Sequence, residues 1–435
     1  MRTAPLASPP MVLPQARYPV EFAFLLATVL FLPLFEVPKT ILCVLYVGTF
    51  LHNRFRDGDW GGGWDGWDTL FAAWLASPFV VAGFAGLHHA EWKGVADVVR
   101  VISLGWLLKR SGYQEAEWLA LLRMLGVSTL LAVSWGLWDW SRPHNYEGIQ
   151  LHSVGHVSHS TIYLVIALTP LIAGMFAFWS RLRLRERMTA IALVAVSLVT
   201  IVLSGSRGAA MMMLLLPLLL GLLWLRRSRW PLLWIALGIA GFGAVVYGLG
   251  DELRHKQSVA LAGADSLLNG REPIWNRAWL TWRQYPAFGV GINNFKNLSD
   301  EKVRQWVEAE GKAYDEKSYR GSSHAHSIYL TTLVERGAFG LVVLLALLGA
   351  WSMSLITGLP SKHDPPLHWL LWCGAAGAFA TTVLIGFANT TLHHEHGLLA
   401  TMLLGMWLGY RRQAQATSEP SLPVAPATGL VKREA

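Results

Sequence analysis

Three basic side chains stand where apolar runs of the sequence meet polar ones, and each suits phosphate binding or proton transfer. Arg207 lies in SGSRGAA, and Arg271 lies in NGREPIWNRAW. A guanidinium group keeps its proton, and its planar fork matches phosphate oxygens. His326 lies in HAHSIYL, and a neutral imidazole can accept a proton from a hydroxyl group. These residues are our candidates for binding a phosphorylated substrate and activating a second one.

The expected surroundings of each candidate support these roles. Arg207 falls in a tight link between two apolar runs, and Arg271 comes just before a helix whose free amides attract anions. If the next apolar helix starts near Ser323, His326 lies in its first turn, where the positive helix end lowers the imidazole pKa. The alternatives are an arginine among lipid headgroups, a solvated loop arginine and a capping histidine.

Apolar helices must position these residues. The sequence is 53% hydrophobic and 15% charged, whereas a soluble protein has roughly 25% charged residues. A helix needs about 20 apolar residues to cross the ~30 Å hydrocarbon core. We therefore predict an all-α polytopic membrane protein with about twelve transmembrane helices. The predicted spans are 20–35, 38–52, 68–87, 95–109, 116–139, 159–180, 188–204, 208–225, 231–249, 327–355, 367–388 and 396–410.

Positively charged loops indicate the cytoplasmic side of the membrane. We interpret these charges as solvated residues that set the topology and account for most of the net charge of +8, so no nucleic-acid partner is needed. The stretch DGDWGGGWDGWD at 57–68 is interpreted as a flexible cytoplasmic loop. With a cytoplasmic N-terminus, the loops on that side carry Arg54, Arg56, Lys109, Arg110, the run at 181–187, Arg226, Arg227, Arg229, Arg411 and Arg412.

This topology divides the chain into five parts. They are a cytoplasmic leader at 1–19, transmembrane helices 1–9 at 20–249, a large loop at 250–325 on the periplasmic or extracellular side, transmembrane helices 10–12 at 326–410, and a disordered cytoplasmic tail at 411–435.

Two amphipathic helices are expected in the large loop. One begins near Pro273, which suits a first helical position, and the other begins after Ser299, a good N-cap. Their tryptophans suggest packing either against the membrane surface and the helix bundle or beneath the loop itself. The expected apolar faces carry Ile274, Trp275, Ala278, Trp279 and Trp282 on the first helix, and Val303, Trp306 and Val307 on the second.

Histidines recur on the predicted periplasmic side. Imidazole is a common transition-metal ligand, but these spacings match no specific metal signature, and HExxH does not occur. We therefore predict no metal and no other cofactor. The histidines are His324 and His326, the HHEH run at 393–396, the pair His88 and His89, and His152, His156 and His159.

Three segments carry a combined pattern. They are SGSRGAAMMMLLLPLLL at 204–220, GREPIWNRAWLTWRQYPAFGVGINNF at 270–295, and HAHSIYLTTLVERGAFG at 324–340. In this order they resemble the O-antigen ligase and polymerase superfamily of bacterial surface-polysaccharide assembly. A fourth likeness, GHVSHSTIYLVIALTP at 155–170, has Ser160 where family members often have Asn.

The resemblance implies a membrane glycosyltransferase of GT-C-like architecture in the bacterial inner membrane. It would transfer O-antigen polysaccharide from undecaprenyl diphosphate to the lipid A-core oligosaccharide at the periplasmic face, among membrane lipids. By the same match, His326 would be the catalytic histidine, and Arg207 and Arg271 would hold the diphosphate. Residue chemistry agrees, because two arginines can stabilise a departing diphosphate without a metal and His326 can deprotonate the acceptor. Direct displacement would invert the anomeric carbon.

Several alternatives stay open. An O-antigen polymerase of the same superfamily would use the same donor with a second lipid-linked chain as acceptor, and a protein O-oligosaccharyltransferase is a further enzyme. A transporter, a flippase or a non-catalytic scaffold comes from a different class. The nine residues between His326-Ser327 and Gly337, with the single large loop, favour the ligase. Glu335 and Arg336 would lie deep in the tenth span and pair with other helices, because adjacent residues on a helix do not face each other. The alternative is that they provide polarity in a pocket for the donor.

Overall fold

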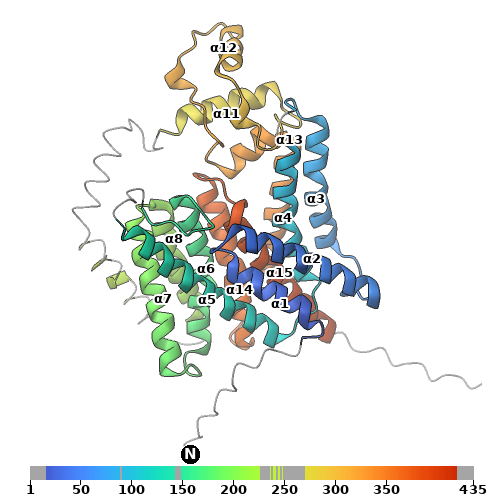
Figure 1. Ribbon diagram of the computed structural model, residues 1–435, viewed down its shortest axis with the longest axis vertical. Coiled ribbons are helices and arrows are strands. Elements are labelled where there is room, and N and C mark those ends of the chain that lie inside the picture. The colour runs from blue at the N-terminus through green and yellow to red at the C-terminus, as the bar shows by residue number, and fades with distance from the viewer. Residues whose placement is uncertain are drawn as a thin grey trace, which may run out of the picture.

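Helices joined by loops make up the described part of the chain (Figure 1). The computed structural model describes residues 16–88, 91–142, 148–225 and 270–418, with isolated helical positions between 236 and 247, and these residues contain no strand. The helices are α1 (Pro19–Phe31), α2 (Glu36–Asp57), α3 (Gly66–Phe84), α4 (Glu91–Lys109), α5 (Glu115–Trp140), α6 (Val157–Phe178), α7 (Leu184–Leu203), α8 (Arg207–Trp224), α11 (Glu272–Gln284), η1 (Phe295–Asn297), α12 (Asp300–Ala309), η2 (Glu316–Ser318), α13 (Ile328–Thr357), α14 (Pro366–Gly386) and α15 (His394–Ser418).

Seven of the described helices, namely α3, α5, α6, α7, α8, α13 and α14, are long and apolar enough to cross a membrane. The prediction of a helical, multi-pass membrane protein is therefore confirmed. Each predicted span except the ninth coincides with a described helix. That ninth span, 231–249, lies largely outside the described residues, so the number twelve stays a prediction.

The centre of the bundle is built from α6 and α14, which pack against each other and have the most buried apolar stretches of the seven helices. Beside them, α15 packs along α4. Their backbones touch at Gly105 and Gly405, because a β-carbon on Gly405 would lie 2.3 Å from the Gly105 carbonyl oxygen. Small residues permit this close approach between membrane helices, and the Thr401 hydroxyl donates to the Val101 carbonyl at the same contact.

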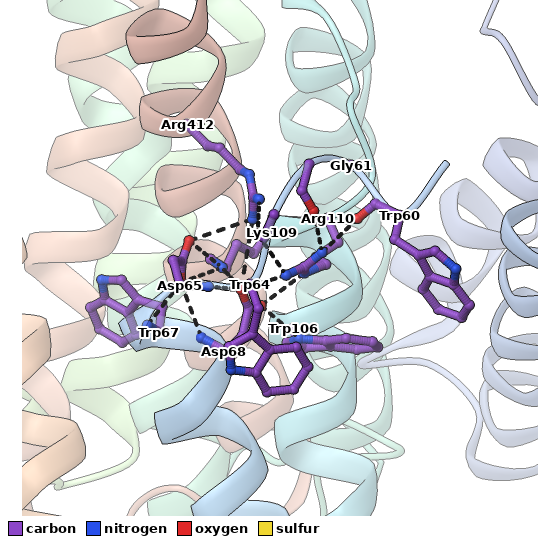
Figure 2. Close-up of polar contacts among 12 residues, drawn as sticks. Trp60, Gly61, Trp64, Asp65, Trp67, Asp68, Trp106, Lys109, Arg110 and Arg412 are labelled. Carbon is purple, nitrogen blue, oxygen red and sulfur yellow. Dashed lines mark hydrogen bonds and ion pairs between the residues drawn. The ribbon is translucent and has the colours of Figure 1, made fainter. Parts of the chain in front are cut away.

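A buried ion cluster joins one end of α3, α4 and α15 (Figure 2). Asp65 and Asp68 form a capping box at the start of α3. The Asp68 carboxylate, fully buried, lies 2.8 Å from the Lys109 ammonium and accepts hydrogen bonds from Arg110. Arg412 of α15 also approaches this carboxylate, at 3.8 Å. Three basic groups therefore surround a single buried carboxylate.

The glycine-rich segment 57–68 holds Arg110 through its backbone (Figure 2). The Arg110 guanidinium donates to the carbonyls of Trp60, Gly62 and Gly63 at 2.7–3.1 Å. A guanidinium has five donors, and the carbonyls satisfy those that Asp68 leaves free. The interpretation of this segment as a flexible loop therefore needs correction, because specific hydrogen bonds fix it.

The interpretation of the basic residues at this end as solvated loop charges is wrong for three of them. Lys109 and Arg110 are only 3% and 4% exposed. Arg54 is 2% exposed and pairs with Glu21 of α1 at 3.4 Å. Burial of a charge is costly unless it is paired and hydrogen-bonded. The acidic residues that neutralise these charges come from other helices, which a count of loop charges does not consider.

Helices α11 and α12 form a cap at one end of the long axis of the molecule (Figure 1). The predicted start of α12 is confirmed, because the Ser299 side chain accepts a hydrogen bond from the Lys302 amide. Arg277 joins the two helices by donating to the Asp300 carboxylate and the Leu298 carbonyl.

The predicted apolar face of α11 is only partly correct. Ile274 and Ala278 are buried, whereas Trp279 is half exposed and the polar Arg277 is buried instead. The position of Arg277 follows from its partners in the α12 segment, which require it to face inward. On α12 the predicted Val303 and Val307 are buried, and they pack beneath Leu280 of α11.

The cap contacts the membrane helices at a break in α13. Gly337 has a left-handed backbone, with φ 65° and ψ −168°, so the helix is interrupted there. The loop after α11 inserts into the break and supplies the hydrogen bonds that the helix loses. The four bonds run from the Val290 amide to the Val334 carbonyl, from Gly291 to Glu335, from Ala338 to Pro286 and from Phe339 to Ala287, at 2.8–3.1 Å.

The break changes where Glu335 and Arg336 lie. Residues 338–357 alone extend about 30 Å at ~1.5 Å per residue, enough to cross a hydrocarbon core. Glu335 and Arg336 precede this stretch and line a pocket below the cap, so their prediction as residues deep in the span needs correction. At the other end of the chain, α15 continues to Ser418, so residues 411–418 of the predicted disordered tail are helical.

Candidate active site

A pocket of about 930 Å³ lies where the cap meets the membrane helices. The cap contributes residues on both sides of α11 and the segment 320–326. The bundle contributes the first turns of α4, α6 and α13 and the link between α14 and α15. The pocket is therefore assembled from segments that are far apart in the sequence.

Arg271 lines this pocket. It is the N-cap residue of α11, follows Gly270 in a left-handed turn at φ 69°, and is half-buried. Burial lowers the pKa of Arg271, and the positive charge of Arg207 lowers it further. Arginine nevertheless remains charged, because its ordinary pKa is above about 12. The two guanidinium groups therefore lie close enough for the charge of Arg207 to act on Arg271.

Arg207 lies at the N-terminus of α8, where it is the first helical residue. Its side chain is exposed and is not among the residues that line the pocket. The turn before it contains Gly205 in a left-handed conformation, which reverses the chain between α7 and α8. Arg207 therefore provides a second positive charge just outside the pocket lining. It stands at the start of a helix, where free amides also attract anions.

His326 lines the pocket from the segment before α13. Its predicted place in the first helical turn is wrong, because α13 begins at Ile328 with Ser327 as N-cap. The pKa of His326 is nevertheless lowered, first by burial and then by Arg271, His156 and Arg320. Its Nε2 atom lies 3.3 Å from the Ser322 hydroxyl. A half-buried, neutral imidazole in a positively charged pocket is a suitable proton acceptor.

Unusual backbone conformations concentrate at this pocket. In the described chain, four residues other than glycine have a left-handed backbone: Asn293, His326, Leu392 and His394. All four line the pocket. Such conformations cost about 1–3 kcal/mol each and persist where the surroundings impose them. The arrangement is therefore fixed by packing and hydrogen bonds from several segments.

Glu335 and Arg336 line the pocket. They do not pair with each other, which agrees with the prediction that adjacent residues on a helix point in different directions. Glu335 accepts hydrogen bonds from the amides of Asn293 and Phe295 in the cap loop. Arg336 donates to the Ser77 hydroxyl of α3, and its guanidinium lies 4.8 Å from the centre of the Trp74 ring. Glu335 thus connects α13 to the cap loop, and Arg336 connects α13 to α3.

Four charged residues of the pocket were not among the candidates predicted from the sequence: Lys93, Asp97, Lys296 and Arg320. Lys93 and Asp97 are four residues apart on α4 and so share one face. A charged pair at that spacing, at the start of a predicted span, is the signal that could have identified them. Lys296 and Arg320 are in the cap, where neither hydrophobic periodicity nor a motif distinguishes them from other exposed basic residues.

The pocket also gathers histidines from three segments. His159 lies 6.3 Å from His324 and 5.0 Å from His393, measured between ring centroids. His324 lies 4.4 Å from His326, and burial, with the neighbouring histidines, lowers the pKa of His324 to about 4. Ser160, which departs from the expected Asn, instead closes the loop before α6 by bonding Leu151 and Gly155.

The fold and the pocket define a multi-pass, helical membrane protein with a basic, histidine-rich pocket beneath the cap. A family model described as O-Antigen ligase matches residues 192–345, from α7 into α13. Residues 192–345 are thus similar to the O-antigen ligase superfamily, whose members are glycosyltransferase-like enzymes of the ligase or polymerase type. The matched part includes Arg207, Arg271 and His326, but not His159 or the histidines of 393–396. No curated protein matches the chain.

Proposed function

We propose that this protein is an O-antigen ligase. It transfers polysaccharide from undecaprenyl diphosphate to the lipid A-core oligosaccharide at the periplasmic face of the bacterial inner membrane. The cap and the pocket then face the periplasm, and the Asp68 cluster faces the cytoplasm. The observation that carries the proposal is the combination of Arg271 and a neutral His326 in one pocket, within the part of the chain that matches the O-antigen ligase model.

In this proposal Arg271 and Arg207 bind the diphosphate of the donor. The bond from the sugar to the diphosphate breaks with the electron pair moving to the phosphate oxygen, so negative charge grows on the leaving group. Fixed positive charges stabilise this change more in a water-poor pocket than in bulk water. The mutual repulsion of the two arginines is relieved when an anion binds between them.

His326 acts as the base of the proposed reaction. Its neutral imidazole accepts the proton of the acceptor hydroxyl as the oxygen attacks the anomeric carbon. The Ser322 hydroxyl near Nε2 helps to orient the ring. The attack comes from the side opposite the diphosphate, so the product has inverted anomeric configuration. In this proposal the arginines stabilise the negative charge of the departing diphosphate, and the transfer therefore proceeds without a metal.

The main alternative is an O-antigen polymerase, which would use the same donor pocket but a second lipid-linked chain as acceptor. The family match supports both reaction types. The spacing from His326-Ser327 to Gly337 resembles the ligase motif, and this favours the ligase.

Reconstitution separates these reactions. The full chain in proteoliposomes is given an undecaprenyl diphosphate-linked polysaccharide with either lipid A-core or more lipid-linked chain as acceptor, in the presence of EDTA. We expect transfer to lipid A-core, loss of transfer in His326→Ala, and unchanged donor binding in that variant. Elongation of the lipid-linked chain instead would establish the polymerase. Full activity of His326→Ala, or dependence on a metal, would contradict the mechanism.

A further inference from the structure

Seven histidines from three segments cluster at one side of the pocket, and all of them except the buried His396 line it. Their rings contact one another, with centroid distances of 3.9–6.3 Å. Such a concentration of one residue type is not needed to fill space, because apolar residues would do so at lower cost. The histidines are His156 and His159 at the start of α6, His324 and His326 before α13, and His393, His394 and His396 at the start of α15.

Three of these histidines are close enough to share a metal ion. Nitrogen atoms of His159, His393 and His394 all lie within 4.8 Å of one another. Ligand nitrogens about 2.0–2.1 Å from a zinc ion in tetrahedral geometry are about 3.4 Å apart, so an ion would draw the three rings closer together than they lie here. Leu392 and His394 both have left-handed backbone, and this turn directs two adjacent histidines toward α6.

The three imidazoles also lack other partners. Within the described residues, none of them has a hydrogen bond, and their ring contacts are to other histidines. The carboxylate nearest in sequence, Glu395, is buried and turns away to pair with Lys39 of α2. Neutral polar groups left unpaired at the edge of a pocket are available to an incoming ligand.

We propose that His159, His393 and His394 form a binding site for a divalent transition-metal ion such as Zn²⁺. Three imidazole ligands without a carboxylate or thiolate suit the late first-row ions. His159, His393 and His394 all line the pocket, so a fourth coordination position is open to water or to a ligand in the pocket. The ion joins the start of α6 to the link between α14 and α15. This inference does not depend on the proposed transfer reaction.

Cobalt is a suitable probe, because tetrahedral Co²⁺ absorbs visible light strongly whereas Zn²⁺ is silent. The full chain, purified in detergent with any affinity tag removed, is titrated with Co²⁺ and then with Zn²⁺. We expect one Co²⁺ per chain with the spectrum of a tetrahedral nitrogen site, and displacement of Co²⁺ by Zn²⁺. Absence of stoichiometric binding would overturn the proposal.

Substitutions locate the site. His394 is exposed, so His394→Gln should fold normally and weaken Co²⁺ binding by more than the ~10–100-fold that loss of an outer hydrogen-bond partner costs. His159→Gln should have the same effect. The matched control is His363→Gln, because His363 is an exposed histidine on the link between α13 and α14. This variant should bind Co²⁺ with the affinity of the unmodified protein. Unchanged Co²⁺ affinity in a correctly folded His394→Gln would exclude this ligand set.

Discussion

A β-carbon on Gly337 of α13 would lie 2.2 Å from the carbonyl oxygen of Ala287, so the cap loop and the broken helix are in direct backbone contact. The contact is possible only because Gly337 has no side chain and adopts φ 65°. Gly289 makes the reciprocal contact, since a β-carbon there would lie 2.5 Å from the Glu335 carbonyl carbon. Two glycines therefore let the cap loop enter the break in α13.

Gly337→Ala should separate the cap from α13. The backbone at φ 65° and ψ −168° is essentially restricted to glycine, so alanine there costs about 1–3 kcal/mol. Its β-carbon also displaces the loop that carries Ile292 and Asn293. We expect a lower thermal unfolding temperature and at least tenfold slower transfer. The matched control is Gly349→Ala in the same helix, where a β-carbon would meet no atom within 4 Å; it should be neutral or slightly stabilising. Similar effects of both substitutions would argue against the contact.

Arg207→Lys should weaken donor binding although it keeps the positive charge. A lysine ammonium cannot form the paired hydrogen bonds of the guanidinium fork with phosphate oxygens. We expect the KM for the lipid diphosphate to rise about tenfold, which corresponds to about 1.4 kcal/mol. Arg185→Lys, an exposed arginine near the far end of α7, serves as the control. A normal KM in Arg207→Lys would remove Arg207 from the diphosphate site.

The pH profile of transfer should depend on the charges around His326. The base is the neutral imidazole, and the pKa of His326 is lowered by burial, Arg271, His156 and Arg320. Activity should therefore hold as the pH falls to about 6.5, the ordinary histidine pKa, and decline only below it. Arg320→Gln removes one positive charge, so the decline should move to higher pH.

Lys317→Gln is the matched control, because it removes a positive charge from η2, three residues before Arg320, and Lys317 is not among the groups that shift the pKa of His326. Its profile should match that of the unmodified protein. If both variants show the same acid limb, a group other than His326 controls the profile.

Asp68→Asn should destabilise the protein without altering the pocket. It leaves Lys109 and Arg110 buried with one carboxylate fewer, and breaking a buried ion pair costs about 3–5 kcal/mol. Asp59→Asn is the control, because the Asp59 and Arg17 side chains are 43% and 60% exposed and such pairs contribute about 1 kcal/mol or less. Thermal unfolding in detergent measures both. Equal unfolding temperatures would mean that the cluster is not a stabilising unit.

Much of the fold could be predicted because apolar runs and helix caps are local signals. Pro273 and Ser299 marked the starts of α11 and α12, and both starts are confirmed within a residue or two. The alternation of apolar and polar segments also placed Arg271 and His326 at the ends of helices, where a pocket could form.

Other features depend on contacts between distant segments. His159 and His393 are separated by several helices, and no local pattern indicates that their rings lie 5.0 Å apart. The burial of Arg110 depends on carbonyls of residues 60–63, which a residue-type pattern does not reveal. The left-handed backbone of His326 likewise follows from surrounding packing and not from its own preference.

The break at Gly337 also constrains how the protein is made. The cap loop that completes the hydrogen bonds of α13 is synthesised before that helix, since chains emerge from the N-terminus. Without the loop, two carbonyls and two amides at the break would lose their hydrogen-bond partners, and buried backbone groups without partners are costly. Completion of α13 therefore requires that the cap loop is already in place beside it, so the order of synthesis along the chain matches the order in which the two segments are needed.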